Sequence, residues 1–266
     1  MQILFSPSES KLSPKSFPKQ HASNTTKALS QNAISILDDA LWGGQVARNA
    51  NINAYLSALA ESNDTQISKI FGTKRIDFDT LSYCLNLANS PRIQAIKLYN
   101  GVAFRALDFA SLDKKAQDFI LDSVLIFSNL FGLVRAKDCL PYYHLNQNYR
   151  SQMLSLNALY KAQKNDIDNF LGINLAQNLA HKTTPNNSNN ITQKTIIDLR
   201  SSVYIKAYPL ITSRFKIPHY ILPIPKGTSH SAKLHRGLAL RELANAFAQS
   251  DEAVQKMLDE RFIYVD

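Results

Sequence analysis

The apolar run that opens the chain constrains its fold most, because it has the length of one buried strand. Gln2 to Phe5 is compact and apolar, and Ser6-Pro7 stops it at once. Further strand-like runs appear only near the other end of the chain, while the region between them has mostly helical spacing. This order predicts an α+β fold in one domain, residues 1–266, with a mixed sheet built from both chain ends and helices surrounding it.

The expected elements follow from runs of apolar residues and from the residues that break them. Asp113 can cap the helix that leads into the apolar stretch Phe119 to Val134, and Gly132 marks a turn near its end. The Gly43-Gly44 pair separates two helical segments between residues 31 and 60. We expect further helices over 151–180 and 232–248, strands over 195–199, 203–208, 216–224 and 262–265, an irregular surface segment over 12–30, and a polar loop over 183–194.

The positive charge of the chain is concentrated in one stretch. The net charge is +9, and residues 191–241 hold nine basic residues against Asp198 alone. These basic residues are dispersed rather than consecutive, which favours a folded basic surface or cleft over a tail. Such a surface suits phosphate-rich partners, with nucleic acid first among them. An evenly solvated basic face is the alternative.

The remaining composition narrows the class of protein. Cys84 and Cys139 are too few for a disulfide framework, so we expect two reduced thiols. The opening apolar run is too short for a signal core, and no apolar stretch reaches the ~18 residues that cross a membrane. We therefore expect a cytoplasmic protein without a membrane partner, and a monomer by default.

The sharpest local feature lies between Lys226 and Gly237, at the start of the helix expected over 232–248. Thr228, Ser229 or Ser231 can cap this helix, and its first turns carry Lys233 and Arg236. A helix N-terminus already favours anions, so added cations there suggest a bound anion, although both could simply reach solvent. His230 and His235 have no identifiable third ligand, so no metal site is predicted.

A second polar cluster follows the first strand. Glu9 and Lys11 stand at its carboxyl end, where a carboxylate beside a lysine could do acid–base work. An exposed ion pair between the two is the alternative.

Four segments of the chain, in order, resemble the YaaA peroxide-stress protein family. They are Ile3-Leu-Phe-Ser-Pro-Ser-Glu-Ser-Lys11, Ala95-Ile-Lys-Leu-Tyr-Asn-Gly-Val-Ala-Phe104, Ile126-Phe-Ser-Asn-Leu-Phe-Gly-Leu-Val-Arg135 with Pro141-Tyr-Tyr-His-Leu145, and Ser231-Ala-Lys-Leu-His-Arg-Gly237. The strand region Thr195 to Tyr208 is also similar, whereas residues 12–90 match poorly.

The resemblance implies an α+β fold with a basic cleft, DNA binding, and a role in limiting iron-driven oxidative damage under peroxide. It also implies a helix-hairpin-helix-like element near residues 119–137, whose turn would offer backbone N–H groups to phosphate. The chain departs from the family there, because Asn129 replaces the first glycine of the turn while Gly132 is kept. Ala136, His144 and Val203 replace the family's proline, arginine and glutamate.

Two functions follow as hypotheses, neither needing a cofactor. The first is a DNA-binding protein of peroxide stress that holds duplex DNA with weak sequence preference, through contacts from Lys97, Asn129, Gly132, Arg135, Ser231, Lys233 and Arg236. The second is an enzyme acting on a nucleotide or nucleobase, with Glu9, Lys11, Tyr99 or His230 doing the chemistry. A pocket that joins residues 6–11, 99–104 and 230–237 would favour the enzyme if it is deep and closed. Direct iron binding lacks the clustered carboxylates and histidines that it would need.

Overall fold

A six-stranded sheet forms the centre of the computed structural model, which describes residues 1–17, 43–173, 195–210 and 217–265. Its strands are β1 (Gln2–Phe5), β3 (Val124–Ser128), β4 (Gly132–Arg135), β6 (Ile196–Leu199), β7 (His219–Ile221) and β8 (Ile263–Val265). They lie in the order β4-β3-β1-β6-β7-β8. The four inner strands run parallel, and the edge strands β4 and β8 run antiparallel to their neighbours. The expected mixed sheet with strands from both chain ends is therefore confirmed, and β3 and β4 add two strands from the middle of the chain.

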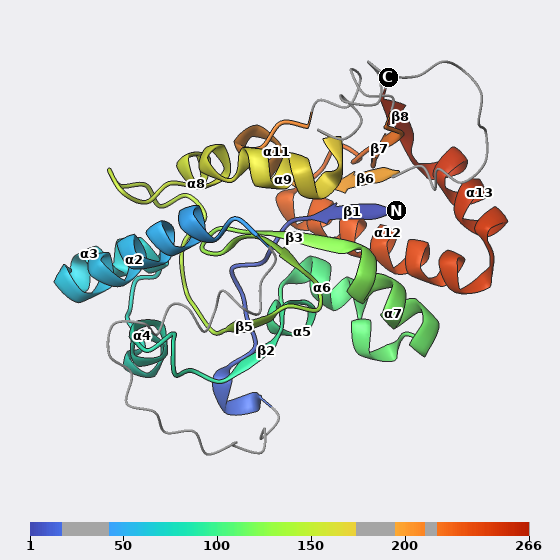
Figure 1. The fold of residues 1–266 in the computed structure, drawn as a ribbon. Coiled ribbons are helices and arrows are strands. Elements are labelled where there is room, and N and C mark those ends of the chain that lie inside the picture. The colour runs from blue at the N-terminus through green and yellow to red at the C-terminus, as the bar shows by residue number, and fades with distance from the viewer. Residues whose placement is uncertain (18–42, 174–194, 211–216, 266) are drawn as a thin grey trace.

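The first strand is buried on both faces, which explains its continuous apolar sequence. Ile3 and Phe5 belong to the larger core, on the side where α6 (Val102–Leu107), α7 (Lys114–Ser123) and α12 (Ser229–Gln249) pack. Leu4 points to the opposite face and joins a smaller core with α8 (Leu156–Ala162), α9 (Lys164–Leu171) and α11 (Ser202–Ala207). Figure 1 shows these two groups of helices on opposite sides of the strands.

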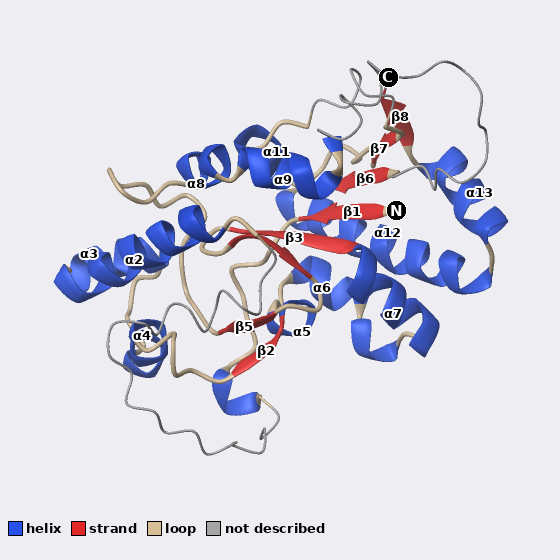
Figure 2. Ribbon diagram, viewed as in Figure 1, coloured by secondary structure: helices blue, strands red, loops and turns tan. Residues whose placement is uncertain are grey.

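Further elements extend the larger core beyond the main sheet. A small antiparallel pair, β2 (Arg92–Gln94) with β5 (Cys139–Pro141), lies apart from the six strands (Figure 2). The other helices are α2 (Gln45–Glu61), α3 (Asp64–Phe71), α4 (Phe78–Leu85), α5 (Ala95–Leu98) and α13 (Asp251–Arg261), with short 3-10 turns at Pro14–Ser16 and Phe109–Ser111.

Several expected boundaries are confirmed by the caps that the chain uses. The Asp113 side chain accepts the N–H of Ala116 and begins α7, and the Thr228 side chain accepts the N–H of Ser231 and begins α12. Gly44 adopts a left-handed conformation directly before α2. The loop expected over 183–194, most of the segment 12–30 and the ends of two expected helices lie outside the described residues.

Two expectations were wrong. Residues 203–207 belong to α11 and Tyr208 is its C-cap, where a strand was expected over 203–208. Tyr204, Ala207 and Tyr208 are buried at helical spacing while Ile205 is 39% exposed. The helix-hairpin-helix-like element near 119–137 is not present: α7 ends at Ser123, and β3 and β4 follow as a strand pair. Among the described residues, no helix is long and apolar enough to cross a membrane.

Candidate functional site

The carboxyl ends of the central parallel strands meet at one edge of the sheet. β1 lies between β3 and β6, and the chain goes first to β3 on one side and later to β6 on the other. Open sheets with this topology bind ligands at the edge where the order reverses. The Ser6 hydroxyl accepts the N–H of Ser201 at 2.8 Å and so fixes the segments that follow β1 and β6 beside each other.

A cavity of about 440 Å³ opens at this edge, and we call it the strand-end pocket. Three segments surround it: the turn after β1, the start of α6, and the start of α12, with the residues after β6 closing one side. The pocket thus joins parts of the three segments 6–11, 99–104 and 230–237, although Lys11 and Tyr99 are not among its lining residues. Its lining includes Ser6, Ser8, Glu9, Gly101, Arg105, Gln147, Ser201, Ser202, Ser229, Lys233 and Arg236.

Two glycines bring the walls of the pocket together. A Cβ on Gly101 would lie 1.9 Å from the Ser8 Oγ, so only glycine lets the turn rest on the start of α6. A Cβ on Gly237 would lie 2.1 Å from the backbone oxygen of Ala103, so only glycine lets α12 cross α6 at this distance. Both glycines belong to motifs that carry the family resemblance, and the structure gives each a packing reason.

Lys233 and Arg236 face the pocket from the first two turns of α12. Neither forms an ion pair or hydrogen bond with any residue that the structure describes. Lys233 is exposed and Arg236 is half-buried, and burial lowers the pKa of the Arg236 guanidinium although Asp198 opposes the effect. An arginine keeps its charge under such a shift, so the pocket wall carries two cations without an acidic partner.

Other basic residues of the 191–241 stretch serve the structure instead. Arg200 is buried directly after β6, forms an ion pair with Asp198 at 2.7 Å, and stacks over the Phe127 ring. Arg241 donates to the Leu107 carbonyl at the end of α6. The single basic cleft therefore stays a prediction, since Lys194, Arg214 and Lys216 lie outside the described residues.

Two of the proposed phosphate contacts lie away from the pocket. Arg135 pairs with Leu125 near the amino end of β3, so it lies at the end of the strands opposite to the pocket. Its guanidinium forms an ion pair with Asp138. Lys97 lines a separate groove. Arg105 lines both this groove and the strand-end pocket. Ser231 is half-buried in the first turn of α12.

The turn between β3 and β4 is enclosed by side chains. The Asn129 amide donates to the Leu145 carbonyl at 2.7 Å, and the Ser128 hydroxyl accepts the backbone N–H groups of residues 130 and 131. Gly132 has φ = 72°, and a Cβ there would collide with Gln163. Asn129 and Gly132 are both buried, so the structure does not bring either residue to a surface where phosphate could reach it.

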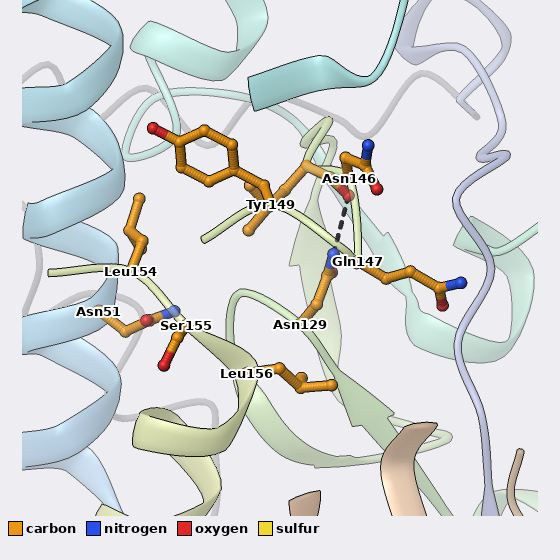
Figure 3. A pocket seen from close by; sticks show the side chains of 9 residues that line it. Asn51, Asn129, Asn146, Gln147, Tyr149, Leu154, Ser155 and Leu156 are labelled. Atoms are coloured by element: carbon orange, nitrogen blue, oxygen red, sulfur yellow. Dashed lines mark hydrogen bonds between the residues drawn. The ribbon is translucent and has the colours of Figure 1, made fainter. Parts of the chain in front are cut away.

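A small cavity adjoins this turn, as Figure 3 shows. Its volume is about 10 Å³, which is room for one water molecule. Asn129 lines one side and Gln147 another, and Gln147 also lines the strand-end pocket. Only the strand-end pocket is large enough, of the two, for a nucleotide.

The four residues considered for acid–base chemistry, Glu9, Lys11, Tyr99 and His230, do not lie together at one site. Lys11 and Tyr99 are held together by a backbone bridge. Glu9 lines the pocket, and its carboxylate accepts the N–H of Gln147 at 3.2 Å. His230 is exposed at the start of α12. Lys11 makes no ion pair with Glu9; its ammonium group donates to the carbonyls of Ser8 and Glu9 at 3.2 and 3.1 Å.

Some residues of the pocket were missed from the sequence. Arg105 carried a signal, because it follows the Tyr-Asn-Gly element by four residues and thus lies one turn into α6. Ser6 and Ser201 gave none, since their meeting depends on the pairing of β1 with β6, which only the sheet order reveals.

Comparison with known proteins agrees with the motifs. A family model described as the peroxide stress protein YaaA matches residues 1–266. A protein of Campylobacter jejuni is 30% identical over 243 residues, covering 90% of this chain and 83% of its own length. A UPF0246 protein of Bordetella avium is 26% identical over 176 residues, covering 64% of this chain and 63% of its own. The chain therefore belongs to the YaaA family of peroxide stress proteins.

Proposed function

We propose that this protein acts under peroxide stress by binding DNA and limiting iron-mediated oxidative damage to it. The family name supports the peroxide role. DNA binding and protection rest on the resemblance and on the strand-end pocket, which we take as the place where a phosphate of the DNA backbone is held.

The observation that carries this proposal is the pair of cations at the start of α12. Lys233 and Arg236 face a pocket whose other polar groups are mostly serine hydroxyls, and no described acidic residue pairs with either cation. Two cations without an ion-pair partner, beside hydroxyl donors, suit a phosphate oxygen, since charge-assisted hydrogen bonds are the strong ones. The Glu9 carboxylate lines the same pocket, and Asp198 acts on Arg236 from outside it. Arg105 extends this surface toward Lys97, which offers a second phosphate contact along the same strand.

We assign the effect on iron damage to the bound DNA. Among residues 1–17, 43–173, 195–210 and 217–265, no three His, Cys, Asp or Glu side chains gather as metal ligands. Non-haem iron sites are typically built from His and carboxylate side chains gathered in such groups. The proposed route is therefore that bound protein covers the DNA.

The test is a fluorescence-anisotropy titration of a labelled 20-base-pair duplex at several salt concentrations. We expect binding that weakens as salt rises, with little dependence on sequence. The double variant Lys233→Ala/Arg236→Ala should bind more weakly and should reduce the salt slope by about one, because the pair neutralises the one phosphate held in the pocket.

The matched control is Lys69→Ala, which removes one exposed lysine from the last turn of α3. It should bind like the unaltered protein. Absence of binding at low salt, or an equal loss in the control and the double variant, would refute the proposal.

An enzyme acting on a nucleotide or nucleobase is the second candidate, and the size of the pocket favours it. A cavity of about 440 Å³ lies within the range of sites for small ligands, at the sheet edge where such sites form. Calorimetric titration with the four deoxynucleoside monophosphates tests this candidate. Saturable binding that duplex DNA does not displace would favour the enzyme over the DNA-binding protein.

A further inference from the structure

We propose that Lys11 is a nucleophilic amine that forms an imine with the aldehyde of a phosphate-bearing sugar held in the strand-end pocket. The inference rests on the proposed phosphate site and adds a covalent step to it. The sugar could belong to an abasic nucleotide in DNA or to a free sugar phosphate, which share the same aldehyde and phosphate chemistry.

The position of Lys11 follows from the way the chain leaves β1. Residues 10–12 pair with residues 98–100, through bonds from the Leu12 N–H to the Leu98 carbonyl and from the Asn100 N–H to the Ser10 carbonyl. Gly101 comes next and begins α6, one wall of the pocket. Lys11 is thus anchored between two segments that line the pocket.

Lys11 does not itself line the pocket, but its amine bonds two residues that do. Its Nζ donates to the carbonyls of Ser8 and Glu9, at 3.2 and 3.1 Å, and both residues face the pocket. The side chain is half-buried, so its end can exchange one of these carbonyls for a ligand by rotation of the long stem.

The surroundings hold the lysine without neutralising it. Its Nζ lies 4.0 Å from the centre of the Tyr143 ring and 5.5 Å from that of Tyr99. The two tyrosine hydroxyls are hydrogen-bonded to each other at 2.9 Å, and the Ser128 hydroxyl bonds Tyr143 at 2.9 Å, so the aromatic platform is rigid. Among the described residues, no carboxylate lies within ion-pair distance of Lys11.

This environment makes the amine reactive near neutral pH. Desolvation lowers the pKa of Lys11 to about 7, although the nearby Cys84 and Glu9 act in the opposite direction. A lysine with this pKa is about half neutral at pH 7, whereas an ordinary lysine is neutral in roughly one molecule in a few thousand. Only the neutral amine has the lone pair that attacks a carbonyl.

The groups that face Lys11 set how this reactivity depends on pH. They are the Glu9 carboxyl, the Cys84 thiol, the hydroxyls of Tyr99 and Tyr143, and the His144 imidazole. Burial raises the pKa of both tyrosines and of the thiol and lowers that of His144, so these four stay neutral at pH 7 to 8. Lys11 is then the group that titrates in this range.

The step is balanced without any further reactant. The neutral Nζ attacks the aldehyde carbon, a C–N bond forms, and a proton moves from nitrogen to oxygen to give a carbinolamine. Loss of water then gives the imine, and Lys233 and Arg236 hold the phosphate meanwhile. Addition of water reverses the sequence and releases the aldehyde.

The experiment traps this imine by reduction in the full-length protein. Ribose 5-phosphate, or a duplex with one abasic site, is incubated with the protein and sodium cyanoborohydride, and the modified peptide is identified by mass spectrometry. We expect labelling of Lys11 at least about tenfold faster than of Lys15, an exposed lysine paired with Asp79. Labelling should rise between pH 6 and pH 8, and ribose without phosphate should label more slowly.

Matched variants keep the test independent of folding. Lys11→Arg retains the charge but cannot form the imine and should abolish the labelled peptide, while Lys15→Arg should leave it unchanged. Circular dichroism and thermal unfolding check that both variants fold, and Lys11→Met serves if Lys11→Arg does not. Labelling spread evenly over surface lysines, or unchanged in the Lys11 variant, would overturn the inference.

The two claims fail separately. If the duplex binds with the expected salt dependence but Lys11 is not labelled by either aldehyde, the imine inference falls and the phosphate site stands. If Lys11 is labelled but inorganic phosphate does not slow the reaction, the phosphate site falls. Labelling by the abasic duplex alone, or by ribose 5-phosphate alone, identifies the source of the sugar.

Discussion

Substitution of Gly237 tests whether the crossing of two helices builds the strand-end pocket. A methyl group at this position would lie 2.1 Å from the Ala103 carbonyl oxygen and 2.8 Å from the Ala106 Cβ. Ordinary contacts need more than 3 Å, so α12 and α6 would have to separate by roughly 1 Å. Since Lys233 lies one helical turn before Gly237 on α12, that separation would also move it away from the turn after β1.

The magnitude follows from two opposing terms. Overpacking in a core costs about 1–3 kcal/mol, and contact with a backbone oxygen places this site at the upper end. Replacing glycine by alanine inside a helix returns about 1 kcal/mol through helix propensity. We expect Gly237→Ala to lower the free energy of unfolding by about 2 kcal/mol, which is a fall in Tm of about 4–8 °C.

Differential scanning calorimetry measures the stability and DNA anisotropy measures the binding. Gly227→Ala is the matched control, because the nearest atom to its added Cβ is an ordinary 3.7 Å away. We expect the control to unfold within about 2 °C of the unaltered protein, since surface changes usually cost under 0.5 kcal/mol. If Gly237→Ala leaves both Tm and DNA affinity unchanged, the helix crossing does not define the pocket.

Three further predictions concern the surroundings of the site. Gly101→Ala should weaken DNA binding because its Cβ would lie 1.9 Å from the Ser8 Oγ, and the double variant with Ser8→Gly should recover affinity in the same titration. Arg200→Met should lower the free energy of unfolding in urea by about 3–5 kcal/mol, since it leaves the buried Asp198 carboxylate unpaired, and an equal loss in Arg200→Met/Asp198→Leu would contradict this reason. Lys11→Met should raise Tm more at pH 6 than at pH 9. The pKa of Lys11 is about 7 in the folded protein and higher in the unfolded chain, so the charged lysine lowers the free energy of unfolding at low pH. This loss of stability becomes smaller as pH rises from about 7 toward 10.

Strands buried on both faces of the sheet could be predicted from the sequence where each is a short continuous apolar run. β1 and β6 read as short apolar runs bounded by breakers, and both occur where expected. The run from residue 119 to residue 134 could not be divided from sequence alone, because a continuous apolar stretch has no period that separates a buried helix from a buried strand. The chain ends the helix at Ser123 and continues as β3, which pairs with β1.

The candidate site was predictable only in its separate segments. Lys233 and Arg236 were found from their place at the start of a helix, and the structure adds that they face the turn after β1. Arg135 was chosen by resemblance, but the antiparallel course of β4 carries it to the opposite sheet edge. The burial of Asn129 and the partners of Lys11 depend on contacts between residues far apart in sequence, which a local pattern does not contain.

The central claim is that the strand-end pocket holds a phosphate group between the turn after β1 and the start of α12. Isothermal titration calorimetry tests it directly, with a dinucleotide joined by a phosphodiester and its counterpart joined by an uncharged methylphosphonate linkage. We expect that only the dinucleotide with the charged phosphodiester binds and that inorganic phosphate competes with it. Lys233→Ala/Arg236→Ala should weaken binding at least about tenfold, since hydrogen bonds to charged groups contribute about 1.5–3 kcal/mol each. Equal binding of the two dinucleotides, or unchanged affinity in the double variant, would contradict it.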